Sequence, residues 1–114
     1  MSIAIGHIGI DTNDVATATA FWTAALGYEA SGYEGGHAFL KDPAERGPGV
    51  FLQSVPEPRS GKNRLHLDLT ADDVEAEAAR LLGLGASEVQ RFMDEGGWIV
   101  LADPDGNQFC VVPE

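Results

Sequence analysis

Cysteine, basic residues and long apolar runs are all scarce in this chain of 114 residues. A single cysteine excludes an intramolecular disulfide. Seven Lys and Arg residues stand against eighteen Asp and Glu, and the net charge of −11 repels phosphate backbones and anionic membranes. No apolar run approaches the ~20 residues that cross a bilayer, and residues 1–10 carry no cationic leader. We therefore expect a cytoplasmic protein with neither nucleic acid nor a membrane as a partner.

Sequence signatures of nucleotide and hydrolase chemistry are absent as well. The chain has no Gly-x-Ser-x-Gly elbow, no Walker loop and no Gly-x-Gly-x-x-Gly fingerprint. A nucleotide cofactor is therefore not predicted. The length fits one domain, whose core needs neither disulfides nor a structural metal. Any bound metal is expected to serve chemistry.

An internal repeat is the strongest pattern that is present. The stretch HIGIDTNDV at residues 7–15 matches HLDLTADDV at residues 66–74, an offset of 59. Each copy continues with an alanine-rich segment ending in Leu-Gly, an apolar strand meeting Asp-Pro, and then Val-Pro-Glu, at offsets of 58, 61 and 57. The repeat predicts a pseudo-symmetric domain in which equivalent positions converge on one site.

Apolar periodicity gives each copy the order β-α-β-β-β. In the first copy we expect strands at residues 3–12, 29–31, 37–40 and 50–55. In the second copy we expect strands at residues 64–70, 87–92, 98–102 and 108–112. The first module thus spans about 1–56, a proline- and glycine-containing hinge spans 57–63, and the second module spans about 64–114.

A helix is expected near the start of each module. The first begins with Asn13 or Asp14 as its cap and ends at Gly27, because glycine accepts the left-handed conformation without steric cost. The second begins at about Asp72 and ends at Gly85. The leucines of the following set are assigned to the core: Leu65, Leu67, Leu69, Leu81 and Leu82.

Strand alternation places His7 and His66 on equivalent, non-core faces. Their equivalence under the repeat predicts that both line one pocket. Neutral imidazole is a good metal ligand, so the pair is a candidate metal site. The alternative is that each histidine is an ordinary surface or hydrogen-bonded group.

Both histidines, together with the turn Asp-Pro-Asp-Gly-Asn at residues 103–107, resemble the glyoxalase, bleomycin-resistance and extradiol-dioxygenase superfamily, the vicinal oxygen chelate proteins. This resemblance implies an α+β fold in which two tandem βαβββ modules form a curled mixed sheet, a half-open barrel with the helices on its convex side. It also implies a cavity with a divalent metal, a small-molecule ligand and a homodimer.

The metal ligands that the resemblance implies are only partly present. His7 and His66 match the first-strand ligands, whereas the glutamate expected on the last strand is Cys110, and the repeat makes Gln53 its counterpart. Without a carboxylate, the set His7, Gln53, His66 and Cys110 favours Zn²⁺ over Ni²⁺, Mn²⁺ or Fe²⁺. Alternatively, Cys110 is a small buried residue and Gln53 binds a ligand by hydrogen bonds.

Other residues could complete the pocket. Asp68 lies roughly 7 Å along the strand from His66, within reach of a role as general base or outer-shell partner, with a solvated carboxylate as the alternative. Phe51 and Trp98 are candidates for apolar walls. The basic residues at the hinge, including Lys62, are assigned to a solvated linker, with attraction of a carboxylated substrate as the alternative.

Three functions remain open at this point. The first is a metal-dependent lyase or isomerase of the glyoxalase type, in which adjacent substrate oxygens chelate the metal. The second is a metal-free protein that binds or sequesters a small molecule, as in the bleomycin-resistance branch. The third is a dimeric module without a small-molecule role. A glutathione adduct, a catechol and an antibiotic are equally compatible with the sequence.

Overall fold

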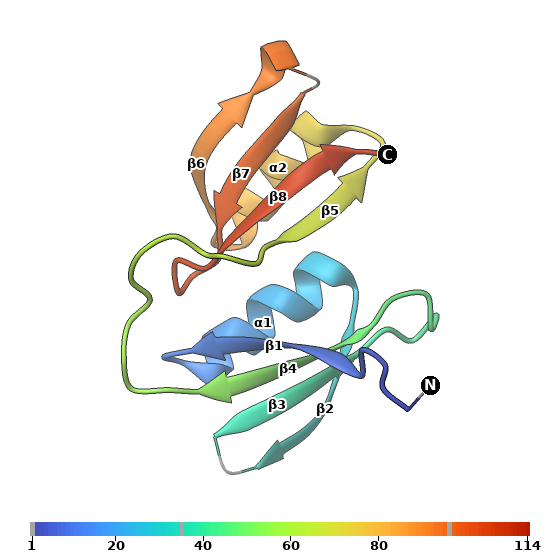
Figure 1. The fold of residues 1–114 in the computed structure, drawn as a ribbon, viewed down its shortest axis with the longest axis vertical. Helices are drawn as coiled ribbons and strands as arrows, with labels where there is room; N and C mark the ends of the chain where they lie inside the picture. Colours follow the sequence, from blue (N-terminus) through green and yellow to red (C-terminus); the bar gives the residue numbers. More distant parts are fainter. Residues whose placement is uncertain (1, 35, 96) are drawn as a thin grey trace. The chain divides into compact units, whose positions relative to one another are not determined.

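Each half of the chain folds as a compact unit in the computed structural model, which describes residues 2–34, 36–95 and 97–114 (Figure 1). The first unit covers Met1–Pro58 and the second covers Arg59–Glu114. Both units contain one α-helix and four strands in the order β-α-β-β-β. The predicted α+β fold of two tandem βαβββ modules is confirmed.

The elements of the first unit form one mixed sheet covered by one helix. Its elements are β1 (His7–Thr12), α1 (Val15–Leu26), β2 (Glu29–Glu34), β3 (His37–Lys41) and β4 (Gly49–Ser54). The strand order is β1-β4-β3-β2, and only the β1–β4 pair is parallel. The sheet therefore stays open, with β1 and β2 as its edges.

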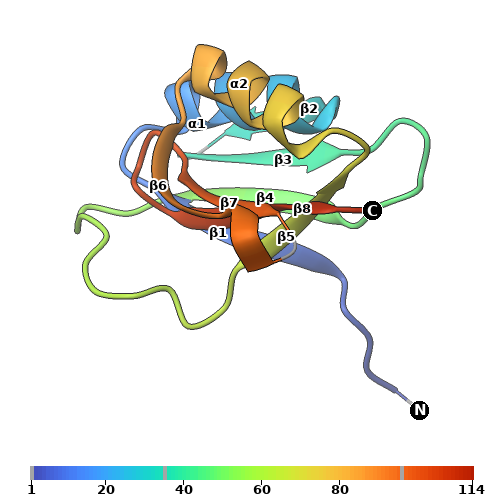
Figure 2. The same ribbon diagram turned by 90° about the horizontal axis from the view of Figure 1, so that it is seen from above.

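The second unit repeats this arrangement. Its elements are β5 (Leu67–Ala71), α2 (Val74–Leu84), β6 (Ser87–Phe92), the 3₁₀ helix η1 (Met93–Glu95), β7 (Trp98–Ala102) and β8 (Gln108–Pro113). The strand order is β5-β8-β7-β6, again with one parallel pair, β5–β8. In Figure 2 each helix lies over one face of its own sheet, which leaves the opposite face of that sheet for a site.

Short polar caps and left-handed residues set the helix boundaries. The Asp14 side chain accepts a hydrogen bond from the backbone N–H of Thr17, and Gly27 ends α1 at φ 70°. Both predicted boundaries of α1 are confirmed. In α2, which was expected from about residue 72, the cap is Asp73, and its side chain accepts a hydrogen bond from the N–H of Ala76. Such caps contribute about 1 kcal/mol each to stability.

The core of each unit lies between its helix and the covered face of its sheet. In the first unit Trp22 of α1 is 1% exposed, and the sheet contributes the buried Ala38, Leu40, Val50 and Leu52. In the second unit Leu81 of α2 is 2% exposed. Its sheet contributes Ile99, Leu101, Phe109 and Val111. Full burial of one large apolar side chain stabilises a fold by about 1.5–3 kcal/mol.

Three sequence expectations, one about a strand start and two about buried leucines, are wrong. The first strand begins at His7 instead of residue 3, and Ile3 and Ile5 are 93% and 86% exposed, because the partner strand β4 begins at Gly49, opposite His7. Leu65 is 90% exposed, since pairing in the second unit begins only at Leu67. Leu82 is 40% exposed on the outer side of α2. Alternation identifies a face but not where pairing starts.

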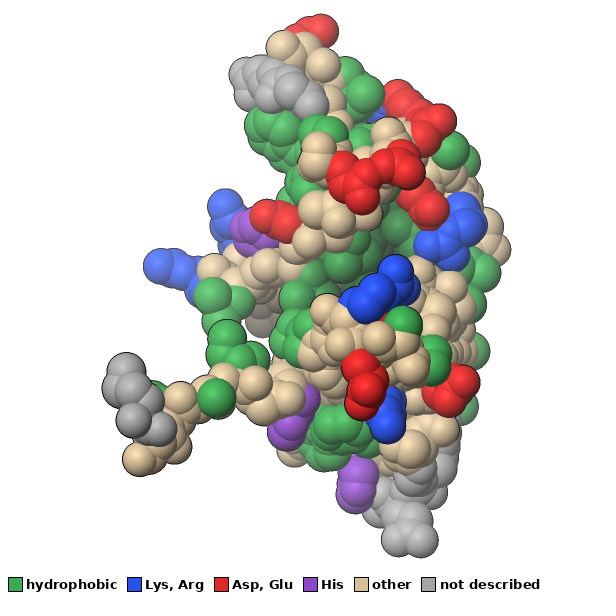
Figure 3. Space-filling view, turned by 90° about the vertical axis from the view of Figure 1, so that its right-hand side faces the viewer, with side chains coloured by type: hydrophobic (Ala, Val, Ile, Leu, Met, Phe, Trp, Pro, Cys, Tyr) green, Lys and Arg blue, Asp and Glu red, His purple; other side chains and the backbone are tan. Residues whose placement is uncertain are grey.

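Acidic side chains dominate the charged surface, as the net charge of −11 requires. Figure 3 shows Asp and Glu side chains grouped on the face in view, with Lys and Arg as smaller patches. Arg91 of β6 is bound within such a group and donates to Glu88 and Glu75 at 2.8 Å each. Among the described residues, no helix combines the length and the apolar character that a bilayer span requires.

Candidate functional site

The uncovered face of the second sheet gathers the polar residues that carry chemistry. His66 immediately precedes β5, and Asp68 lies on β5 directly opposite Cys110 of β8. Cys110 in turn pairs with Val100 of β7. Side chains alternate along a strand, so these residues lie on the face opposite the buried Phe109 and Val111.

This face encloses a cavity of about 520 Å³. His66, Asp68 and Cys110 line it, together with Trp98, whose ring stacks on Phe92 at a centroid distance of 4.8 Å and an interplanar angle of 19°. The volume lies within the range of small-molecule pockets, and its aromatic wall beside convergent polar groups is typical of them.

The cavity also contains polar side chains at its rim. Lys62 lines it as a basic residue, and Gln90 and Gln108 add amide groups. The cation of Lys62 and the anion of Asp68 give the cavity both signs of charge. A ligand with a negative group and neighbouring oxygens therefore finds complementary partners here.

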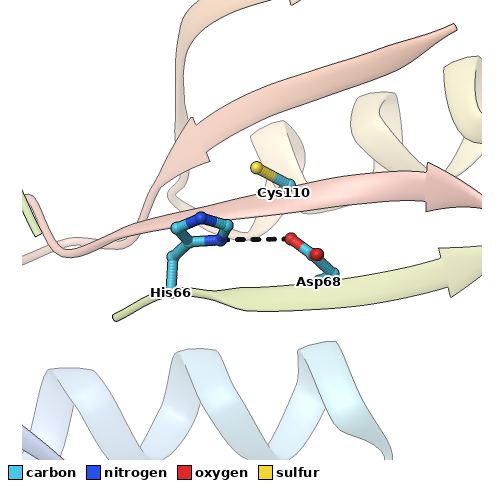
Figure 4. Close-up of side chains that lie close together, drawn as sticks. All are labelled: His66, Asp68 and Cys110. Atoms are coloured by element: carbon cyan, nitrogen blue, oxygen red, sulfur yellow. Dashed lines mark hydrogen bonds and ion pairs between the residues drawn. The ribbon is translucent and has the colours of Figure 1, made fainter. Parts of the chain in front are cut away.

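His66, Asp68 and Cys110 form a cluster of three potential ligands. The Nδ1 atom of His66 lies 3.1 Å from Oδ1 of Asp68, and one donor atom from each of the three residues lies within 4.8 Å of the others. Figure 4 shows His66 and Asp68 on one strand segment and Cys110 on the neighbouring β8. The side chains of His66 and Asp68 are 48% and 55% exposed, so solvent and small ligands reach them.

Cys110 is held as a thiol in this arrangement. Burial raises its pKa above the ordinary value, and the charge of Asp68 and a hydrogen bond to that carboxylate raise the pKa further. The carboxylate stabilises the S–H form by accepting its proton in a hydrogen bond. A thiol whose pKa is raised in this way is a poor nucleophile at neutral pH.

The turn before β8 positions Cys110. Oδ1 of Asp103 accepts hydrogen bonds from the backbone N–H groups of Asp105 and Asn107, at 3.0 and 2.8 Å. Oδ1 of Asn63 accepts a hydrogen bond from the N–H of Gln108, the first residue of β8. These contacts hold the start of β8 beside the segment that leads into β5, and so bring Cys110 opposite Asp68.

The uncovered face of the first sheet is aromatic instead. His7 lies with its ring centroid 5.4 Å from that of Phe39 and 5.8 Å from that of Phe51. His37 lies 5.3 Å from Phe51 on the other side. Gln53 pairs with His37 and is exposed.

The residues predicted from sequence therefore fall into two groups. His66, Asp68, Cys110 and Trp98 are brought together in the cavity of the second unit. His7, Gln53 and Phe51 lie in the first unit. The prediction that His7 and His66 line one pocket stays a prediction, because the two histidines lie in different units.

Some residues of these faces escaped sequence reasoning. Phe92 and Gln108 line the cavity: alternation along β8 from Cys110 identifies Gln108, whereas Phe92 follows only from the β6–β7 register, which pairs it with Trp98. His37 was not paired with any residue of the second copy, yet the offset of 61 between the Asp-Pro dipeptides makes Trp98 its counterpart. The two residues begin β3 and β7 respectively.

Each of the two βαβββ units has a histidine at or beside the start of its first strand, as the resemblance noted in the sequence implies. The chain belongs to the family of glyoxalase-like domains, whose model matches residues 7–112. No curated protein matches the chain.

Solved structures of related fold cover almost the whole chain. A glyoxalase/bleomycin resistance protein/dioxygenase family enzyme from Burkholderia phytofirmans PsJN is 17% identical, with a TM-score of 0.79 and coverage of 97% of this chain and 98% of the other. The fosfomycin resistance protein FosX from Listeria monocytogenes is 18% identical, with a TM-score of 0.79 and coverage of 100% and 95%. An E126Q mutant of that FosX, solved with Mn(II) and 1S,2S-dihydroxypropylphosphonic acid, is 19% identical, with a TM-score of 0.76 and coverage of 98% and 90%.

Proposed function

We propose that this protein binds a small oxygen-bearing molecule in the cavity of the second unit and acts on it as a divalent-metal-dependent lyase or isomerase. The observation that carries the proposal is that an imidazole, a carboxylate and a thiol lie close together in the lining of a cavity with an aromatic wall. Membership in the glyoxalase-like family and the Mn(II) complex of a FosX neighbour support a metal-dependent chemistry.

The donor chemistry of the site suits a divalent ion. His66, Asp68 and Cys110 would hold it, and the candidate set from sequence adds His7 and Gln53. Such an ion supplies Lewis acidity to adjacent substrate oxygens. Trp98 and Phe92 would bind the apolar part of the substrate, and Lys62 would orient a negative group. Asp68, in contact with His66, is the carboxylate that would accept and return a proton.

A second candidate is a metal-free protein that sequesters a small molecule. One observation favours it: the three side chains are hydrogen-bonded to one another, Cys110 to Asp68 and Asp68 to His66. The cavity then binds by shape, stacking and hydrogen bonds alone.

Ligand binding can be followed by the fluorescence of Trp98. The chain has two tryptophans, and Trp22 is buried in the core, so Trp22→Phe leaves Trp98 as the reporter of the cavity. We expect saturable quenching by one of three probes: a dihydroxyalkyl phosphonate, a glutathione thioether or a bleomycin-type antibiotic. Loss of quenching in Trp22→Phe/His66→Ala assigns binding to this cavity. Absence of any change with all three probes, with and without Zn²⁺, contradicts the proposal.

The two candidates differ in their need for metal. Quenching that disappears on treatment with a chelator and returns with Zn²⁺ supports the metal-dependent function. Quenching that is unchanged by the chelator supports sequestration. The homodimer expected for this family remains a proposal, which light scattering of the purified protein tests through its mass in solution.

A further inference from the structure

Position 110 lacks the expected carboxylate, but the neighbouring strand β5 supplies one from Asp68. The resemblance places a glutamate on the last strand, where this chain has Cys110. Asp68 lies directly across the parallel β5–β8 ladder from Cys110, so its carboxylate reaches the same part of the cavity. Its counterpart in the first copy is Gly9, which has no side chain to offer.

The separations between donor atoms suit a single small ion. Metal–nitrogen and metal–oxygen bonds of about 2.0–2.1 Å at a tetrahedral angle hold two donors about 3.3 Å apart. His66 Nδ1 and Asp68 Oδ1 are 3.1 Å apart, and all three donors lie within 4.8 Å of one another. A shift of about 1 Å brings the sulfur to bonding distance. The side chains of His66 and Asp68 are 48% and 55% exposed, so a shift of this size requires little repacking around them.

We propose that His66, Asp68 and Cys110 by themselves form a thiolate-containing site for a thiophilic divalent ion such as Zn²⁺ or Co²⁺, with no ligand from the first unit. The inference deepens the proposed function and rests on its metal-dependent form. Three protein ligands leave a fourth position open to the cavity for water or substrate. One oxygen of Asp68 binds the ion, and its second oxygen remains available for a proton.

The surroundings of His7 in the first unit support a metal site made by the second unit alone. His7 packs on Phe39 and Phe51, and Gln53 offers a neutral amide. Neither a carboxylate nor a thiol lies on that face at the positions equivalent to Asp68 and Cys110. The ligand chemistry therefore also sets the choice of metal: a thiolate favours Zn²⁺, Co²⁺ or Cd²⁺ over Mn²⁺ and Mg²⁺.

Titration of the full metal-free chain with Co²⁺ tests the site directly. Coordination by Cys110 gives an ultraviolet thiolate-to-cobalt charge-transfer band, and a four-coordinate site gives intense visible bands. We expect both at one Co²⁺ per chain, displacement of Co²⁺ by Zn²⁺, and no displacement by an equal concentration of Mn²⁺. Equal binding of Mn²⁺, or a spectrum without the charge-transfer band, overturns the proposal.

Single substitutions assign the ligands. His66→Ala, Asp68→Asn and Cys110→Ser should each weaken Co²⁺ binding by more than about 100-fold, beyond the 10–100-fold that loss of an outer hydrogen-bond partner costs. The amide introduced by Asp68→Asn still accepts a hydrogen bond from His66, so a smaller loss with an unchanged spectrum at saturation makes Asp68 a positioning residue and overturns its assignment as a ligand. Circular dichroism and the fluorescence of Trp22 verify that each variant is folded.

Matched variants of the first unit are the controls. His7→Ala and Gln53→Ala should leave Co²⁺ affinity and spectrum unchanged within about twofold. If His7→Ala abolishes binding while Cys110→Ser does not, the ion is held by the two first-strand histidines, which overturns this inference and leaves the metal-dependent function standing. If the wild-type protein binds neither Co²⁺ nor Zn²⁺, this inference fails. The fluorescence titration of Trp98 then decides separately whether the cavity binds a small molecule.

Discussion

The two units share a topology but differ in the chemistry of their uncovered faces. In the first unit that face carries His7, Phe39 and Phe51 in mutual ring contact. In the second unit the equivalent face carries the cluster of His66, Asp68 and Cys110 beside a cavity. The core beneath each helix is mostly apolar in both units. The two copies thus share the packing of the fold and differ in the side chains of the open face, because a closely packed face tolerates few changes.

Substitutions in the cores of the two units are expected to cause the largest loss of stability. Trp22 and Leu81 occupy equivalent positions of α1 and α2 at the offset of 59, and both are almost fully buried. We expect Trp22→Ala to lower the free energy of unfolding by about 3–5 kcal/mol and Leu81→Ala by about 2–5 kcal/mol, through lost burial and the cavity left behind. Urea denaturation measures both. A loss below about 1 kcal/mol at either position would contradict its place in the core.

The second-largest loss of stability is expected in the turn before β8, at Asp103. Asp103 is 2% exposed and accepts hydrogen bonds from two backbone N–H groups. Asp103→Ala leaves these donors unpaired, and we expect a loss of about 1–3 kcal/mol in the free energy of unfolding. Because the turn positions β8, the variant should also weaken Co²⁺ binding at Cys110. Full stability together with weaker binding would show that the turn serves the site and not the fold.

Asp42, the counterpart of Asp103, makes the stability of the first unit depend on pH. Hydrogen bonds from the backbone N–H groups of Ala44, Arg46 and Gly47, with the charge of Arg46, hold the pKa of Asp42 below its ordinary 3.8, although burial opposes this. A depressed pKa contributes stability above the unfolded-state value that is lost as the pH falls through the folded-state value. We expect the free energy of unfolding to fall below pH 3.8, and to fall less steeply in Asp42→Asn.

Urea denaturation at several pH values between 2.5 and 7 measures this effect. This range brackets the pKa of an ordinary aspartate, ~3.9. Asp94→Asn, on the surface of the second unit, is the control and should keep the acid slope of the wild-type protein. Identical slopes for Asp42→Asn and the wild-type protein would show that the Asp42 turn is not formed in solution.

Substitution of Gly83 is expected to change stability least, and to raise it where the other substitutions lower it. The residue lies inside α2, exposed, and a Cβ built there meets no atom within 4 Å. Gly83→Ala should therefore raise the free energy of unfolding by about 0.5–1 kcal/mol. Gly85→Ala is the matched control: its φ of +121° is strained for alanine, so we expect a loss there. Equal effects of the two substitutions would contradict the helix boundary at Leu84.

Much of the fold could be predicted because its signals are local. The caps at Asp14 and Gly27 and the apolar runs of β7 and β8 each depend on neighbours in the chain. The exposure of Leu65 could not be predicted in this way, because it depends on where Phe109, far along the chain, begins to pair. The same holds for Asp68. The strand spacing between His66 and Asp68 is roughly 7 Å, which did not predict direct contact. In the structure Nδ1 of His66 lies 3.1 Å from Oδ1 of Asp68.

Repeats, periodicity and charge are properties of the chain, and from them alone follow the duplicated β-α-β-β-β order, the two equivalent histidines and the acidic character of the protein. The folded structure adds that Asp68 lies opposite Cys110 and 3.1 Å from His66, within a cavity lined by Trp98 and Phe92. Parallel pairing of β5 with β8 joins segments that are distant in the chain, so no local pattern predicts this arrangement. Alternation specifies which face a side chain takes, whereas the register between strands specifies which side chains meet.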